Sequence, residues 1–281
     1  VEFHVWKGIL VEASPVFGDM TAFDGTTADG AVTLTETSAA LEPFLRMCYP
    51  PPHGPPISQL GVLLSVIALA HKYQADGVLQ TLKNLLVKKF SPAEPLRVYA
   101  IAVRLEMTDV MEAAARDFLA IPSFGPYTEE LEGLSAGVYH RLLTYRSKCN
   151  DTLEEMIQSN LAWLPPGPWM TISCDNKNCA KSSVTCRIKR NVSFFESRIN
   201  PDRPVPVDPS VWFWNHHNRM AKLLKDRPCS AALSSANLLE RGIVEASSCI
   251  SCREKAPETL RLFNDRLRAE VDRRIHEVSL S

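Results

Sequence analysis

The sequence lacks several features that would assign a chain to a functional class at once. Its longest nearly apolar run, Leu60 to Ala70, is about half of the roughly 20 residues that a membrane-spanning helix needs, so we expect a core helix and no membrane partner. No internal repeat of roughly 20 to 50 residues is present, which excludes propellers and ankyrin arrays. A Gly-rich phosphate loop, a G-x-S-x-G elbow and an H-E-x-x-H helix are also absent. We therefore predict no catalytic or cofactor-binding residues and no enzyme.

The net charge of −1 hides an uneven distribution of charge along the chain. Residues 1–164 hold 12 Lys and Arg against 19 Asp and Glu, and residues 165–281 hold 19 against 13. The first part is therefore acidic and the second part basic. Because the basic residues are dispersed among acids, we interpret them mainly as a solvated surface and expect no nucleic-acid partner. A DNA-contacting surface is the alternative.

The length and composition indicate an ordinary globular protein with more than one domain. The chain has 281 residues, of which 45% are hydrophobic and 22% are charged. Its clearest boundary is the Pro-rich stretch from Leu164 to Pro168, which cannot be helical. We predict three parts: a first domain at 1–90, a helical extension at 91–163, and a mainly helical region at 164–281 that contains six of the eight cysteines.

The first twenty residues change from one hydrophobic period to another. Residues 1–5 alternate apolar and polar side chains, which predicts a strand with one solvated face. From Trp6 onward the apolar residues recur at helical spacing, and Ser14-Pro15 restarts a helical turn. A second short strand is expected at 32–34. Because the chain has no initiator Met and begins inside a predicted strand, we expect it to be truncated at the N-terminus.

This stretch resembles the core motif of the BTB/POZ domain. The residues that carry the resemblance, and that form the expected interaction motif, are Phe3, Trp6, Lys7, Leu10, Ser14, Phe17 and Met20. The resemblance implies an α+β fold, in which a small sheet lacking its first strands is capped by helices. It also implies self-association, often as a homodimer, and relatives that serve as adaptors of cullin-type ubiquitin ligases or as transcriptional regulators. The layout of BTB domain, helices and cysteine-bearing tail is similar to that of a large fungal group.

Helical periodicity extends through most of the remaining chain. The expected helices lie at 38–48, which must stop at Pro50, around 60–67 and 78–86, at 96–105, 108–118 and 136–149, and around 260–278. The order of strand, helix, strand and then several helices agrees with the BTB/POZ pattern over residues 1–90. In the last helix, apolar residues form a stripe opposite Arg, Asp and Glu, and such a stripe most often covers a core.

Two departures from the BTB/POZ pattern bear on the partner. Trp6 stands where a His usually precedes Lys7, and residues 46–75 contain no Asp or Glu. Cullin-binding relatives generally present a hydrophobic-x-acid triplet in this region, so the departures argue against a cullin partner. We predict a non-enzymatic protein–protein interaction module with a dimerisation or adaptor role. A transcription-associated regulator that contacts DNA and a cullin adaptor are the alternatives.

Two short-spaced cysteine pairs suggest a structural zinc site. Cys174 and Cys179 form one pair, and Cys249 and Cys252 form the other. Four thiolates of this kind suit tetrahedral zinc, and the substitutes for any one of them are Cys186, His216 and His217. Buried thiols without a metal are the alternative. Because nothing in the sequence indicates secretion, we expect reduced thiols and an intracellular protein, cytoplasmic or nuclear.

Two further groups of residues have a chemical and a structural interpretation. His216 and His217 follow three aromatic residues at 212–214, and rings clustered on one helix usually belong to a core. A hydrolase that pairs a histidine with Cys229 or Cys186 stands only on residue types. The basic and aromatic residues between Arg187 and Phe195 are weak evidence for nucleic-acid binding.

Overall fold

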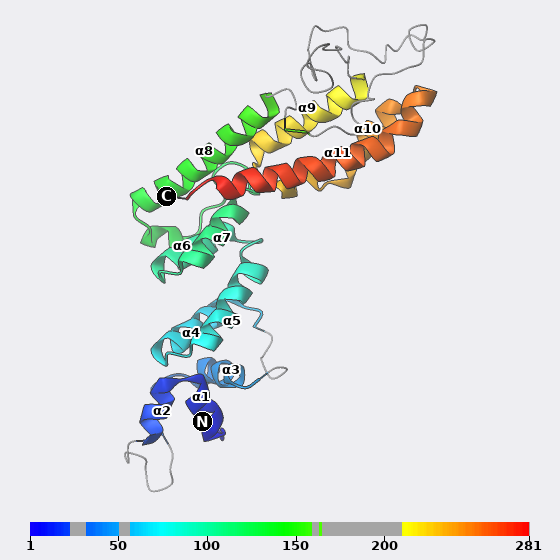
Figure 1. Cartoon of the computed structure of the whole chain (residues 1–281). Helices are drawn as coiled ribbons and strands as arrows, with labels where there is room; N and C mark the ends of the chain where they lie inside the picture. Colours follow the sequence, from blue (N-terminus) through cyan, green and yellow to red (C-terminus); the bar gives the residue numbers. More distant parts are fainter. Residues whose placement is uncertain (23–31, 51–56, 159–162, 165–209, 281) are drawn as a thin grey trace. The chain divides into compact units, whose positions relative to one another are not determined.

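The computed structural model describes residues 1–22, 32–50, 57–158, 163–164 and 210–280 (Figure 1). The chain divides into two compact units, Val1–Ala114 and Ala115–Ser281. Every regular element within the described ranges is a helix, and none of these ranges contains a strand. The three-part division predicted from the sequence, with boundaries near residues 90 and 164, stays a prediction.

The prediction of an α+β fold with a BTB/POZ-type sheet is wrong for the described chain. Residues 1–6 and 32–34 are not helical, and the backbone at Trp6 is extended, with φ −80° and ψ 114°. Neither segment pairs with another in the part of the chain that is described. Alternating polarity decides only which side chains share a face, whereas a strand also needs a neighbour whose backbone completes its hydrogen bonds.

The first unit is built from short helices. They are α1 (Lys7–Ala13), α2 (Pro15–Ala22), α3 (Ser38–Cys48), α4 (Leu60–Lys72), α5 (Asp76–Leu85), the π-helical segment η1 (Leu86–Phe90), α6 (Pro95–Arg104) and α7 (Thr108–Phe118), which crosses into the second unit. Proline marks several boundaries. Pro15 and Pro95 open their helices, where no N–H is needed, and α3 ends just before Pro50.

Helix α4 forms the centre of the first unit. It packs against α3 on one side and α5 on the other. Leu63, Val66 and Ile67 are fully buried, as are Phe44 of α3 and Leu82 of α5. The apolar run Leu60 to Ala70 is therefore a core helix, as predicted. No helix within the described ranges is both long and apolar enough to cross a membrane.

The second unit is a set of longer helices that pack on one another. They are the 3-10 segment η2 (Glu129–Gly133), α8 (Ala136–Gln158), α9 (Val211–Asp226), the 3-10 segment η5 (Ser230–Leu233), α10 (Ala236–Ala246) and α11 (Ile250–Glu277). Helix α11 contacts α8, α10 and η5, and α9 packs against α8 and α10 (Figure 1). The predicted stripe on α11 is confirmed from Leu260 to Ile275, where Phe263, Leu267 and Val271 are buried.

A glycine allows the closest approach of helices in the second unit. A Cβ atom at Gly242 of α10 would lie 2.6 Å from Cδ1 of Leu260 in α11 and 3.3 Å from Nδ1 of His216 in α9. The first of these distances is shorter than any carbon contact that a packed core tolerates. A side chain at Gly242 would therefore require the buried Leu260 to move.

Candidate protein-interaction surface

The predicted interaction motif lies on α1 and α2 and divides into buried and exposed residues. Leu10, Ser14 and Phe17 are buried, with exposed fractions of 7%, 0% and 5%. Phe3 and Met20 are half-buried. The buried motif residues therefore anchor this segment to the first unit. The remaining two motif residues, Trp6 and Lys7, lie on the surface.

Ser14 ties the junction of α1 and α2 to the end of α4. Its hydroxyl donates a hydrogen bond to the backbone carbonyl of Tyr73, 59 residues further along the chain. The same oxygen accepts a hydrogen bond from the N–H of Phe17 at 3.2 Å, at the start of α2. Ser14 therefore serves both a helix end and a tertiary contact.

Three aromatic rings complete this anchor. The ring of Phe17 stacks on Tyr73 with centroids 4.6 Å apart and an interplanar angle of 9°. Phe44 of α3 lies 5.7 Å from the same tyrosine ring. Offset stacking of this kind adds to the stabilisation from burial alone. The rings hold α2, α3 and the end of α4 together.

Beside the ring cluster, Glu36 is hydrogen-bonded to Tyr73 and paired with Lys72. Tyr73 donates its hydroxyl to Glu36 Oε2 at 2.9 Å, and Lys72 forms an ion pair with the same carboxylate. The hydrogen bond from Lys72 lowers the pKa of Glu36. Burial, followed by the hydrogen bond to Glu36, raises the pKa of Tyr73. The segment that contains Glu36 is thus fixed against the end of α4.

Large apolar side chains of the first eleven residues point into solvent. The exposed fractions are 99% for Val1, 37% for Val5, 75% for Trp6 and 41% for Val11. We call these four residues the N-terminal apolar surface. The backbone at Trp6 is tied to the end of α3, because its N–H donates to the Tyr49 hydroxyl at 2.8 Å. A tryptophan this exposed on a fixed backbone is typical of a protein-binding surface.

The predicted zinc ligands are only partly within the described chain. Cys249 and Cys252 are buried, with exposed fractions of 5% and 4%, at the start of α11. Cys174, Cys179 and Cys186 lie outside the described residues. Within the described ranges, no group of three or more His, Cys, Asp or Glu is arranged to hold a metal ion. Because two of the four predicted ligands lie outside the described residues, the four-cysteine site stays a prediction.

The two adjacent histidines belong to the core of the second unit. His216 is fully buried, and its Nε2 lies 2.8 Å from Oδ1 of Asn264 in α11. The ring of His217 stacks on Trp214 with centroids 5.7 Å apart. Burial lowers the pKa of both imidazoles, to about 4 for His217. Both side chains are neutral near pH 7 and pack as the sequence interpretation expected.

The structure gives no support to a Cys–His pair at Cys229. Burial raises the pKa of its thiol, opposed by hydrogen bonds from the amides of Ala232 and Ala231 and by two arginines. No histidine is among the described groups that act on it. The second cysteine of the hydrolase alternative, Cys186, and the basic and aromatic residues from Arg187 to Phe195 lie outside the described residues.

Arg146 of α8 is an interaction centre that sequence reasoning missed. The side chain is 8% exposed and donates to three backbone carbonyls: those of Phe118 at 3.2 Å, Ile121 at 2.8 Å and Asp226 at 2.6 Å. Its guanidinium also lies 5.5 Å from the ring centroid of Phe118. Burial lowers the pKa of Arg146. Because the acceptors are main-chain oxygens, no partner residue type could signal this cluster in the sequence.

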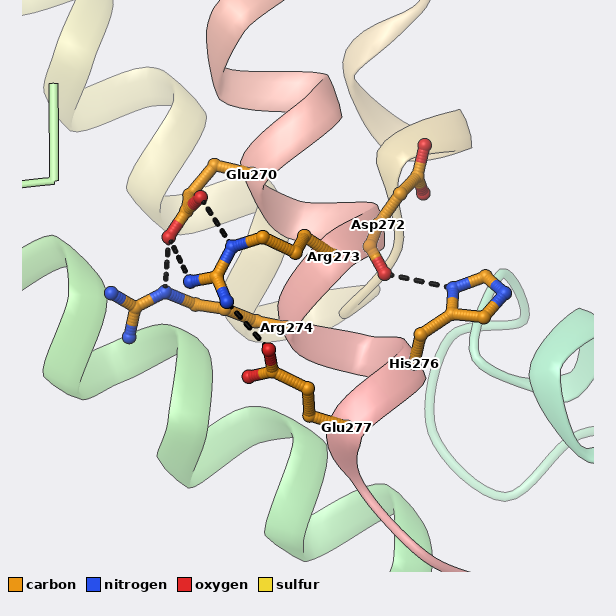
Figure 2. Close-up of polar contacts among 6 residues, drawn as sticks. All are labelled: Glu270, Asp272, Arg273, Arg274, His276 and Glu277. Atoms are coloured by element: carbon orange, nitrogen blue, oxygen red, sulfur yellow. Dashed lines mark hydrogen bonds and ion pairs between the residues drawn. The ribbon is translucent and has the colours of Figure 1, made fainter. Parts of the chain in front are cut away.

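At the end of α11, arginines from the basic second part of the sequence pair with glutamates of the same helix (Figure 2). Glu270 accepts hydrogen bonds from Arg273 Nη2 at 2.7 Å and from Arg274 Nε at 2.7 Å. Arg273 also reaches Glu277 at 2.5 Å. These hydrogen bonds lower the pKa of Glu270 to about 2. Two arginines are thus neutralised within one helix, which favours the interpretation of a solvated surface.

No family model, no curated protein and no solved structure matches the chain. The feature that combines an anchored backbone with exposed apolar side chains is the N-terminal apolar surface.

Proposed function

We propose that the first unit is a non-enzymatic protein–protein interaction module, and that the chain self-associates through the N-terminal apolar surface. The observation that carries the proposal is Trp6, which is 75% exposed while its N–H is hydrogen-bonded to Tyr49. A side chain held ready in this way loses little backbone freedom on binding.

The physical basis is the burial of apolar area that now faces water. Tryptophan is prominent among residues that dominate binding energy, particularly where neighbouring apolar groups exclude water around it. In a two-fold symmetric dimer each copy contributes the same patch, so one exposed surface suffices for both sides. The proposal concerns contacts made by α1 and the residues before it, and it requires no sheet.

The test is the mass of the purified full chain in solution, measured by sedimentation equilibrium. We expect a dimer that Trp6→Ala weakens roughly 30-fold, the equivalent of about 2 kcal/mol. Val11→Glu should dissociate it by placing a charge in the contact. The matched control is Val244→Glu, since Val244 of α10 is 69% exposed and lies in the second unit. A monomeric wild type, or equal dimerisation by all variants, would refute the proposal.

The two alternatives from the sequence have direct tests of their own. A cullin adaptor would retain a cullin N-terminal domain in a pull-down with micromolar or tighter affinity. A DNA-contacting regulator would bind duplex DNA nonspecifically, with affinity that falls steeply as salt rises. The absence of acids from residues 46–75 and the paired arginines on α11 disfavour these alternatives.

A further inference from the structure

The connection between α7 and α8 carries two aromatic side chains that project into water. Phe124 is 65% exposed and Tyr127 is 67% exposed. Two exposed glutamates, Glu129 and Glu132, follow them in η2. We call these four residues the aromatic-acidic surface. It lies entirely in the second unit, apart from the N-terminal apolar surface in sequence and in chemistry.

Helix α8 fixes both ends of this connection. Arg146 donates a hydrogen bond to the carbonyl of Ile121 at 2.8 Å. At the other end, the Ser135 hydroxyl accepts from the N–H of Val138 at 3.3 Å. Between them, Ser123 and Gly125 have φ angles of 57° and 73°, in a region that residues with a side chain rarely adopt. The backbone that carries the aromatic-acidic surface is therefore held in one conformation without a partner.

The ring of Tyr127 and the two glutamates lie next to one another. The Tyr127 hydroxyl donates to Glu132 Oε1 at 3.0 Å. This hydrogen bond is the main cause that raises the pKa of Tyr127, and the charges of Glu132 and Glu129 act in the same direction. Neither glutamate forms an ion pair with a residue that the structure describes. Uncompensated negative charge thus stands beside the exposed ring of Tyr127, and the exposed Phe124 lies three residues before it in the sequence.

We propose that the aromatic-acidic surface binds a segment of a partner protein that is rich in lysine and arginine. A cation gains energy over an aromatic face, and a guanidinium pairs with a carboxylate through two parallel hydrogen bonds. A purely apolar partner would desolvate the carboxylates without pairing them. Nucleic acid and anionic lipid would be repelled by the same charges. Charge complementarity therefore selects a basic peptide.

The experiment measures binding of a fluorescein-labelled peptide of alternating lysine and arginine to the full chain by fluorescence anisotropy. We expect saturable binding that weakens as salt rises. Phe124→Ala should weaken it about two- to five-fold, the effect of one exposed cation–π contact. The double variant Glu129→Gln with Glu132→Gln should weaken it by at least as much. Both changes are on the surface, and circular dichroism checks that the helices persist.

Matched variants separate specific binding from general attraction. Glu254→Gln with Glu258→Gln removes two exposed carboxylates from α11 and should leave the affinity unchanged. Tyr127→Phe keeps the ring and should bind better than Tyr127→Ala. The proposal is overturned if Phe124→Ala binds as tightly as the wild type, or if the α11 pair costs as much as the Glu129 and Glu132 pair. Equal binding of a peptide of alternating glutamate and aspartate would also overturn it.

Discussion

Arg146 donates a 2.6 Å hydrogen bond to the backbone carbonyl of Asp226, 80 residues further along the chain. Asp226 is the last residue of α9, and Phe118, the last residue of α7, supplies a second carbonyl acceptor. The buried guanidinium therefore satisfies carbonyls at the ends of two helices, where the helix dipoles favour a positive charge.

We expect Arg146→Met to destabilise the second unit by about 2–4 kcal/mol, because buried carbonyls lose their donors. Arg146→Lys should fall between this variant and the wild type, since one ammonium cannot reproduce the planar fork of donors. Urea unfolding followed by circular dichroism measures the change. The control is Arg141→Met, an exposed position on the same helix. A loss from Arg146→Met no larger than that of the control would contradict the assignment.

Ser14→Ala tests the anchor of the N-terminal segment. The substitution leaves the carbonyl of Tyr73 without its buried donor, which costs about 1–2 kcal/mol of unfolding free energy. Ser65→Ala is the matched control, because that hydroxyl bonds within α4 on an exposed face. Equal unfolding midpoints for the two variants would refute this role for Ser14.

His217 makes the stability of the second unit depend on pH. Its pKa in the folded state is about 4, below the usual 6.5, so the unfolded chain takes up a proton first as the pH falls. Stability is therefore greatest above pH 6.5 and decreases toward about pH 4, by at most about 1.4 kcal/mol per pH unit for this group. We expect urea midpoints to fall between pH 7 and pH 5. His217→Phe should flatten that slope, whereas His140→Gln on an exposed site should not.

Glu270 makes the stability of the second unit depend on pH in a more acidic range than His217 does. Its folded-state pKa of about 2 lies below the usual 4.5, so its contribution is fully present above pH 4.5 and is lost as the pH falls toward 2. Because its partner Arg273 is 53% exposed, solvent screening limits the contribution to about 1 kcal/mol. Glu270→Gln should cost that amount at pH 7 and less in high salt. An equal cost for Glu254→Gln, which lies on an exposed face of the same helix, would contradict the network.

Metal analysis of the purified chain tests the predicted zinc site. A site formed by Cys174, Cys179, Cys249 and Cys252 predicts about one zinc per chain, and less than about half an equivalent counts against it. Cys249→Ser with Cys252→Ser should abolish the metal. Cys48→Ser is the control, because Cys48 lies in α3 of the first unit. Unchanged zinc in the double variant would exclude these two thiols as ligands.

Periodicity predicted the helices well because a helix satisfies its own backbone. The stripe on α11 and the apolar run of α4 both lie where the spacing of their residues placed them. The expected strands failed because pairing is a property of two segments, and the alternation in residues 1–5 says nothing of the second. The motif residues Ser14 and Phe17 are buried against Tyr73, a partner that the sequence does not indicate. Its acceptor is a main-chain carbonyl, as are those of Arg146, so residue types gave no sign of it.

Helix α8 contacts α9 and α11 through residues that are far apart in the sequence. Arg146 of α8 donates a hydrogen bond to the last residue of α9, and both α9 and α11 pack against α8. We therefore expect two separately produced polypeptides, one ending after α8 and the other beginning at α9, to associate when mixed, which size-exclusion chromatography of the mixture would show. The second unit is therefore suited to fragment complementation, in which association of the two fragments is the measured signal.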